Sequence, residues 1–204
     1  MEFVYWPIKG LAEYQRWVFA YCKAAYTEKN VTDYEKWLQE RDTLGLEFPN
    51  LPYLIDGDFK ITESQAIAHY IAAKFKPELI GADIKEQTKI KMINGVFHDI
   101  ADAFNSIYKK IDNYKAAIEE DMKSNKTADK VEHLSKYLGT KEFIQGHITL
   151  NDLEFGPLYQ RVRAVCRTHG VENPFEKYPN LVALYERLRV TPGIKEHLES
   201  DAGK

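Results

Sequence analysis

Residues 50–71 read NLPYLIDGDFKITESQAIAHYI, and this stretch decides the fold of the first part of the chain. Tyr53-Leu54-Ile55 and Phe59-Lys60-Ile61 are β-prone runs on either side of Asp56-Gly57-Asp58, which predicts a β-hairpin. Thr62-Glu63-Ser64 then lies where a helical pattern begins. A strand that leads into a helix leaves unpaired backbone N–H groups at the junction, and such groups can hold an anion. The stretch therefore predicts a hairpin, a helix and a candidate anion site between them.

The residues before the hairpin predict a strand, a helix and a weaker second strand. Phe3-Val4-Tyr5 is a β-prone run that is closed by a turn containing Pro7 and Gly10. Apolar residues then recur at helical spacing, at Leu11, Tyr14, Val18 and Tyr21/Cys22. Tyr26 to Val31 is a more polar candidate strand, and residues 34–48 are typical of irregular or short-helical structure. With the helix that ends before Pro77, the predicted order is βαβ followed by ββα.

From residue 84 onward the pattern is helical. Apolar residues at three- and four-residue spacing predict a long helical stretch over 84–115, and they are Ile90, Ile93, Phe97, Ile100, Phe104, Ile107 and Ile111. Residues 124–127 predict a polar loop, and Thr149-Leu150-Asn151-Asp152 resembles a capping box with Asp in place of Glu. Shorter helices are expected after Pro179 and near Pro192. We therefore predict two domains, 1–78 and 84–204.

Composition limits the kinds of partner. The 204 residues are 44% hydrophobic, which is enough for a packed core, and 28 Lys and Arg against 31 Asp and Glu argue against a nucleic-acid partner. No run of about 18 apolar residues and no signal peptide is visible, so we expect a cytoplasmic protein without a membrane partner. Cys22 and Cys166 are far apart in the sequence, which predicts reduced thiols and no metal site.

Three blocks of sequence resemble the soluble glutathione transferases, and most of all their mu class. The blocks are YWPIKGLA at 5–12, LGLEFPNLPYLIDGDFKITESQAI at 44–67 and TLND at 149–152, and the central block is highly specific. The resemblance covers nearly the whole chain. It implies an α/β plus all-α protein, in which a thioredoxin-like N-terminal domain is followed by an all-helical C-terminal domain. It also implies a homodimer with a glutathione site in each subunit.

The chain departs from the mu pattern in several places. Glu63 replaces a Gln, Arg41 replaces a Lys, and Tyr34 replaces an Arg that some mu enzymes have. The segment from Tyr26 to Trp37 is also shorter than its mu counterpart. "Mu-like", with features of other tyrosine-type classes such as sigma, describes this chain better than "mu".

The resemblance implies a glutathione site built by the first domain. The implied contacts are Trp6, Leu11, Trp37, Arg41, Asn50, Leu51, Pro52, Glu63 and Ser64. Ser64 and nearby N–H groups would bind the γ-glutamyl carboxylate, and Glu63 would bind its ammonium group. Trp6, Trp37 and Arg41 would hold the glycyl carboxylate, for which a guanidinium is well suited.

Two of these positions keep a simpler interpretation open. In the family the bond before Pro52 is cis, which implies that the Leu51 backbone pairs with the cysteinyl part of glutathione. A trans proline at the start of an edge strand fits the sequence equally well. Ser64 could likewise serve only as a helix cap.

Tyr5 is the candidate catalytic residue. A free thiol has a pKa of about 8.5, whereas the thiolate is the nucleophile. A phenol that donates a hydrogen bond to sulfur stabilises the thiolate. The alternative is an aromatic side chain that merely packs at the end of a strand, since the chain has 13 tyrosines.

The resemblance is less specific about the second substrate and the dimer. Ile8, Leu11, Phe104 and Tyr108 are the candidates for an apolar second-substrate pocket. Phe48 matches the aromatic residue that inserts into the neighbouring subunit of the family dimer, and an exposed Phe supports an interface. Where the family brings an acid to the partner's glutathione, this chain has His98 with Asp99 beside it.

The predicted function is conjugation of glutathione, as co-substrate, to small electrophiles. A sigma-type, prostaglandin-synthase-like isomerase would keep Tyr5 and differ in the acceptor pocket. A non-catalytic glutathione- or ligand-binding member would be expected to lose Tyr5 or the Glu63-Ser64 pair, and both are present. A disulfide reductase would need a reactive Cys at the start of the first helix, where there is none.

Overall fold

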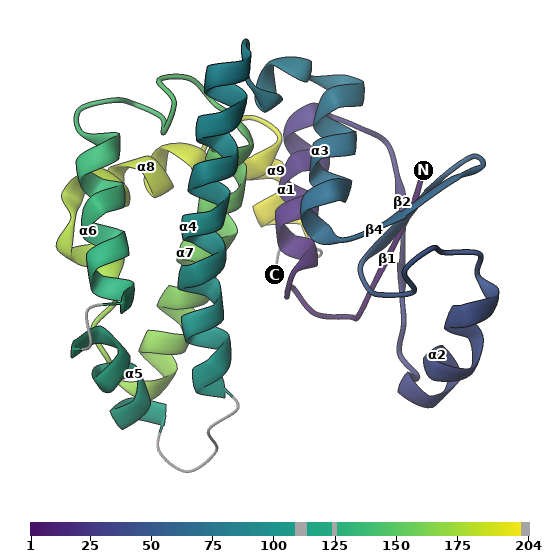
Figure 1. Cartoon of the computed structure of the whole chain (residues 1–204), viewed down its shortest axis with the longest axis horizontal. Coiled ribbons are helices and arrows are strands. Elements are labelled where there is room, and N and C mark those ends of the chain that lie inside the picture. The colour runs from purple at the N-terminus through teal and green to yellow at the C-terminus, as the bar shows by residue number, and fades with distance from the viewer. Residues whose placement is uncertain (109–113, 124–125, 201–204) are drawn as a thin grey trace. The chain divides into compact units, whose positions relative to one another are not determined.

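The computed structural model describes residues 1–108, 114–123 and 126–200, and these divide into two compact units (Figure 1). The first unit comprises Met1–Ile80 together with Pro192–Lys204, and the second comprises Gly81–Thr191. The sequence predicted one helical domain over 84–204, whereas the structure groups the segment from Pro192 onward with the first unit. Each unit is described below by itself.

The first unit contains a four-stranded mixed sheet with the order β2-β1-β3-β4. Its strands are β1 (Glu2–Tyr5), β2 (Thr27–Asn30), β3 (Tyr53–Asp56) and β4 (Phe59–Thr62). β1 and β2 are parallel, with Glu2 opposite Thr27, while β1–β3 and β3–β4 are antiparallel. A parallel pair requires a crossover connection, and α1 (Ala12–Cys22) supplies it. The predicted strands and hairpin are therefore confirmed.

Helices cover both faces of this sheet. α1 packs against α3 (Ser64–Phe75) on one face, and α2 (Tyr34–Glu40) lies on the other (Figure 1). The short 3-10 helices η1 (Arg41–Thr43) and η2 (Pro77–Ile80) follow α2 and α3. The core between the sheet and α1/α3 contains completely buried apolar side chains, among them Phe3, Trp17, Leu54, Ile67 and Ile71. Burying a side chain of this size contributes about 1.5 to 3 kcal/mol.

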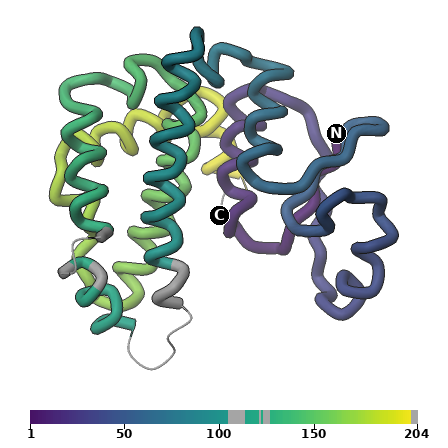
Figure 2. The backbone as a smooth tube through the Cα atoms, viewed as in Figure 1, coloured from purple at the N-terminus to yellow at the C-terminus, as the bar shows by residue number. Residues whose placement is uncertain are grey.

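The last described helix, α9 (Ile194–Glu199), packs on α1, although the two are far apart in the sequence. Figure 2 shows this yellow segment beside the purple first helix. Gly193 (φ 90°) lies so close to the Ala20 carbonyl oxygen that a Cβ would clash with it. Ile194 is completely buried, so α9 belongs to the core of the first unit.

The second unit is entirely helical in its described part. Its elements are α4 (Ile84–Tyr108), α5 (Tyr114–Lys123), α6 (Lys126–Leu138), α7 (Leu150–His169), η3 (Pro174–Lys177) and α8 (Pro179–Arg189). α4 and α7 run side by side (Figure 1). The predicted apolar positions of α4 from Ile90 to Phe104 are buried. The side chain of Ile107 and the whole of Ile111 lie outside the described residues.

The predicted capping box at the start of α7 is confirmed. The Asp152 carboxylate accepts hydrogen bonds from the Thr149 N–H at 2.9 Å and the Thr149 hydroxyl at 3.1 Å. It also accepts one from the Ile144 N–H at 2.9 Å. Asp152 is completely buried, and this burial raises its pKa to about 6 despite the three bonds.

Within the described ranges, no helix is both long enough and apolar enough to span a membrane. The same residues contain no cluster of three or more His, Cys, Asp or Glu side chains that could hold a metal ion.

Candidate active site

The Tyr5 side chain lies at the carboxyl end of β1 and is 5% exposed. Its hydroxyl oxygen accepts a hydrogen bond from the Leu11 N–H at 3.1 Å. A phenol oxygen that accepts this bond keeps its own proton available for a second partner, and hydrogen bonds in such a chain strengthen one another. The Tyr5 hydroxyl can therefore still donate a hydrogen bond, and its catalytic role stays a prediction.

The turn between β1 and α1 lies directly against the Tyr5 ring. Gly10 has φ +44°, and a Cβ at this position would lie 2.6 Å from the Tyr5 hydroxyl oxygen. Only glycine fits both the backbone conformation and the space. The position of this turn therefore sets the surroundings of the Tyr5 hydroxyl.

The second part of the site is the junction between β4 and α3. Ser64 is the first residue of α3, whose initial N–H groups have no carbonyl partner within the helix and favour an anion. Glu63 before it has φ 71° and ψ 118°, a conformation that costs a non-glycine residue about 1 to 3 kcal/mol. Such strain is concentrated at ligand sites, so this junction is a strong candidate for one.

Residues 50–52 lie next to this junction. The Leu51-Pro52 peptide bond is cis, as the family resemblance implied. The Asn50 side chain donates to a Glu63 carboxylate oxygen at 3.4 Å and accepts from the Leu51 N–H at 2.9 Å. The structure thus brings Asn50, Leu51, Pro52 and Glu63 together, as predicted.

Aromatic residues form a third group. The rings of Trp6 and Trp37 meet edge to face with centroids 6.5 Å apart, and Trp37 stacks with Tyr53 at 6.1 Å. Trp37 is buried on α2, and Arg41 begins η1 directly after this helix. The Arg41 Nε is buried without a hydrogen-bond partner and lies 3.8 Å from an Asp42 carboxylate oxygen. The segment from α2 to η1 therefore carries an indole N–H and a guanidinium, the kinds of hydrogen-bond donor that a carboxylate site needs.

The structure does not test the predicted second-substrate pocket. Ile8 and Leu11 are exposed, 57% and 46% respectively, whereas Phe104 is buried on α4 at 1%. The side chain of Tyr108 lies outside the described residues. That these residues line the pocket of the second substrate therefore stays a prediction.

The predicted dimer residues are exposed. Phe48 is 72% exposed, which is unusual for so large an apolar side chain. On α4, the His98 imidazole lies 3.1 Å from an Asp102 carboxylate oxygen. Asp99 accepts from Lys130 at 2.8 Å, and this hydrogen bond holds the Asp99 pKa below its usual value.

Sequence reasoning missed several polar side chains that support the site from α1. Gln15 is completely buried and donates to the Ser64 carbonyl oxygen at 2.7 Å, which ties α1 to the start of α3. Arg16 donates to the carbonyl oxygens of Ile8 and Lys9 at 3.2 and 3.3 Å. Polar residues within an otherwise apolar helix were the available signal, but their partners are remote in sequence.

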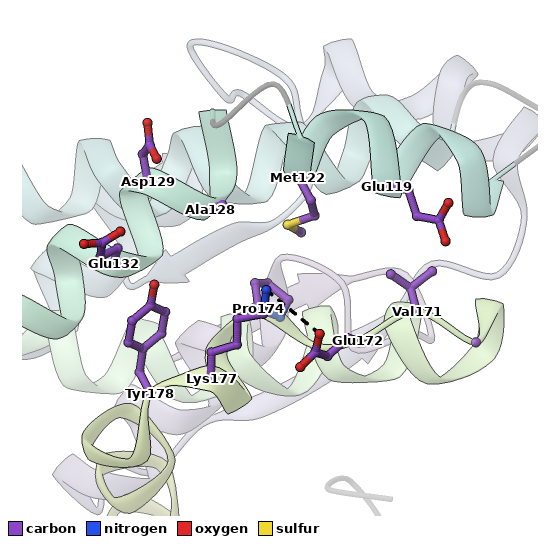
Figure 3. A pocket seen from close by; sticks show the side chains of 11 residues that line it. Glu119, Met122, Ala128, Asp129, Glu132, Val171, Glu172, Pro174, Lys177 and Tyr178 are labelled. Atoms are coloured by element: carbon purple, nitrogen blue, oxygen red, sulfur yellow. Dashed lines mark ion pairs between the residues drawn. The ribbon is translucent and has the colours of Figure 1, made fainter.

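The helical unit has a separate pocket of about 610 Å³, lined by α5, α6, the turn after α7 and η3 (Figure 3). Its lining mixes apolar side chains such as Met122 and Val171 with acidic ones, and Glu172 pairs with Lys177 at 3.9 Å. None of the predicted site residues lines this pocket.

The first unit thus combines a thioredoxin-like fold with a buried tyrosine at the end of β1, a cis-proline and a helix N-terminus, the features that the resemblance to glutathione transferases implied. Family models agree: the glutathione S-transferase N-terminal domain matches residues 1–73, and the C-terminal domain matches residues 98–201. The chain belongs to the glutathione S-transferase family.

Its relatives include class-mu members. The chain is 32% identical to a glutathione S-transferase class-mu 26 kDa isozyme of Schistosoma mansoni, covering 98% of this chain and 88% of the relative. It is 31% identical to glutathione S-transferase Mu 4 of Homo sapiens, covering 98% and 91%.

Solved structures agree with this fold. The crystal structure of the glutathione S-transferase Blo t 8 superposes with a TM-score of 0.76 at 27% identity, covering 100% of this chain and 94% of that chain. Rat hPGDS complexed with a quinoline gives a TM-score of 0.82, covering 97% and 95%, but its 22% identity supports the fold alone.

Proposed function

We propose that this protein is a glutathione transferase, which binds glutathione, stabilises its thiol as the thiolate and adds it to small electrophiles. The thiol proton passes to solvent and the thiolate sulfur forms the new C–S bond, while the electrophilic carbon gives up the electron pair of the bond that breaks, either to a departing anion or to an atom that then takes up a proton from solvent. The observation that carries the proposal is the buried Tyr5 hydroxyl, which accepts a hydrogen bond from the Leu11 N–H and keeps its own proton for a sulfur.

The energy required matches one such bond. Lowering a thiol pKa by two units from about 8.5 requires about 2.7 kcal/mol. A hydrogen bond to a charged group contributes roughly 1.5 to 3 kcal/mol. A single phenol donor is therefore nearly sufficient, and holding both reactants in one site would supply further acceleration.

The remaining groups match the two charged ends of glutathione. We assign the γ-glutamyl carboxylate to Ser64 and the first N–H groups of α3, and the ammonium to the Glu63 carboxylate. The strained backbone of Glu63 supports this assignment.

The middle and the far end of the peptide complete the proposed pose. The Leu51 backbone beside cis-Pro52 would pair with the cysteinyl part, with Asn50 beside it, and Leu11 would contact glutathione near the sulfur. The glycyl carboxylate would be held by Trp6, Trp37 and Arg41.

We further propose a homodimer in which the exposed Phe48 inserts into the neighbouring subunit. Asp99 is paired with Lys130 and His98 with Asp102, so whichever of the two reaches the partner's site would have to exchange its present partner for the neighbouring subunit's glutathione. The apolar electrophile would contact Ile8, Phe104 and Tyr108. A cytoplasmic location and the lack of nucleic-acid and membrane partners remain predictions from the sequence.

The decisive experiment is a pH titration of the thiolate absorbance of bound glutathione. The wild-type protein should ionise the thiol well below the pKa of about 8.5 of a free thiol. Tyr5→Phe should bind glutathione but raise the bound thiol pKa by one to two units, roughly 1.4 to 2.7 kcal/mol.

Tyr70→Phe is the matched control, because it removes a phenol of the same unit that bonds to Asp56 instead. It should leave the thiol pKa unchanged. An unshifted thiol in the wild-type complex would refute the transferase assignment and favour a non-catalytic binding protein.

A further inference from the structure

Four charged or polar side chains of the first unit, two of them buried and two half-buried, form one connected network. The Nε2 of His197 on α9 lies 2.9 Å from one Glu13 carboxylate oxygen. The other Glu13 oxygen accepts from Arg16 at 3.3 Å, and Arg16 makes a two-pronged contact with Glu28 of β2. Glu13 and Arg16 are 2% and 5% exposed, so water screens these contacts little.

At its other end the network contacts the turn between β1 and α1, next to Tyr5. One Arg16 nitrogen donates to the carbonyl oxygens of both Ile8 and Lys9. The Lys9 carbonyl also accepts from the Glu13 N–H at 3.0 Å. Arg16 therefore holds this turn in place through its two carbonyl oxygens, and Glu28 and Glu13 hold the Arg16 guanidinium in one orientation.

The clamped turn contacts Tyr5. Leu11, two residues after Lys9, donates its N–H to the Tyr5 hydroxyl oxygen, and Gly10 lies against the ring. A shift of the Ile8 and Lys9 carbonyls would move this donor. Misplacement of a reacting group by about 1 Å can reduce a rate by 100-fold.

The charges explain the place of His197. Arg16 faces two carboxylates, so a second positive group beside Glu13 balances the cluster when the imidazole is protonated. Burial acts to raise the Glu13 pKa, but the hydrogen bond and charge of His197, with Arg16 and Lys9, lower it overall. Helix α9 thus docks through an ionic contact as well as through the apolar contact of Ile194.

We propose that Arg16 is a positioning residue for Tyr5, and that α9 acts as a latch on Arg16 through the His197–Glu13 contact. The proposal rests on the proposed role of Tyr5. It adds that α9 affects the reactivity of the Tyr5 site without itself contacting the reacting sulfur.

Two variants test the network in the full-length protein, at a temperature where circular dichroism shows each to be folded. Arg16→Lys keeps the charge but cannot hold Glu28 and both carbonyls at once. It should lower kcat about tenfold with KM for glutathione within twofold, and raise the bound thiol pKa. His197→Ala should move kcat and the thiol pKa in the same direction by a smaller amount, about threefold in kcat.

Lys195→Ala is the control, because Lys195 lies on the same helix and pairs only loosely with Glu199, at 3.9 Å. It should leave kcat and the thiol pKa unchanged. If Arg16→Lys and His197→Ala lower the melting temperature but leave kcat and the thiol pKa unchanged, the network is merely structural and the proposal is wrong. If Arg16→Lys does not fold, His197→Ala alone decides.

A double-mutant cycle separates this proposal from the function on which it rests. In a Tyr5→Phe background, His197→Ala should have no further effect on kcat, because the network acts through the lost hydroxyl. Full additivity would overturn the positioning role. If Tyr5→Phe alone leaves the thiol pKa unchanged, the proposed function fails. If Tyr5→Phe raises it and the network variants do not, only the latch fails.

Discussion

Each unit buries one acid in the first turn of a helix, and the two acids behave in opposite ways. Glu13 of α1 and Asp152 of α7 are both at most 2% exposed. Burial acts to raise both pKa values. Around Glu13, His197, Arg16 and Lys9 outweigh burial and lower the pKa. Around Asp152, the donors are the neutral groups of Ile144 and Thr149, and burial prevails.

The difference lies in the charge of the partners and in their distance along the chain. The cations around Glu13 add their charge to the hydrogen bonds that favour the carboxylate, whereas Asp152 has hydrogen bonds from neutral groups alone. The partners of Asp152 lie within eight residues of it, whereas His197 lies 184 residues from Glu13. Asp152 therefore organises a local turn, while Glu13 joins the chain's last described helix to the turn beside Tyr5.

The largest expected effect on stability comes from removing Asp152, the acid whose partners are all neutral. Asp152→Ala would leave the Ile144 N–H, the Thr149 N–H and the Thr149 hydroxyl without their acceptor. Each buried group left unsatisfied costs about 1 to 3 kcal/mol, and relief from burying the carboxylate offsets part of the sum. We expect the free energy of unfolding in urea to fall by about 3 to 4 kcal/mol. Asp129→Ala, at an exposed first-turn acid of α6, should change it by less than about 1 kcal/mol.

A smaller effect should appear in the pH dependence of the same site. Asp152 binds its proton more tightly in the folded protein, at a pKa of about 6, than its ordinary value of 3.8 would give in the unfolded chain. The stability from this group is therefore fully present below about pH 4 and is lost as the pH rises through 6.

The measurement is the wild-type minus Asp152→Asn difference in unfolding free energy between pH 4 and pH 7. It should decline by roughly 2 to 3 kcal/mol as the pH rises. Asp129→Asn should show no such trend. A difference that grew with pH would mean that the three hydrogen bonds outweigh burial.

The same contrast explains how much could be predicted from sequence. The hairpin, most of the helices and the Asp152 capping box follow from residues within a few positions of one another, and they were predicted. The polar loop predicted over 124–127 was wrong at Lys126 and Thr127, which begin α6. The cis bond at Pro52 and the grouping of Asn50 with Glu63 came from the family motif. The Gln15–Ser64 bond, the Arg16 clamp and the docking of α9 were missed, because no local pattern pairs residues so far apart in the chain.

The smallest expected effect is at Glu13, and it has the opposite sign with pH. Glu13→Gln keeps an acceptor for Trp17 but removes the charge that faces His197 and Arg16. We expect a loss of about 1 to 2 kcal/mol at pH 7, in the range for a hydrogen bond to a charged group. Because the folded pKa lies below the ordinary 4.5, this stability is present above pH 4.5 and is lost as the pH falls through the folded pKa.

The wild-type minus Glu13→Gln difference should therefore shrink as the pH falls below about 4.5, through the folded pKa of Glu13. Glu35→Gln, at the exposed first-turn acid of α2 in the same unit, is the matched control and should show little dependence. A Glu13 difference that declined between pH 4 and 6 as the pH rose, like that of Asp152, would contradict the contrast. It would mean that the surrounding cations do not stabilise the Glu13 carboxylate, and the ionic latch between α9 and α1 would lose its physical basis.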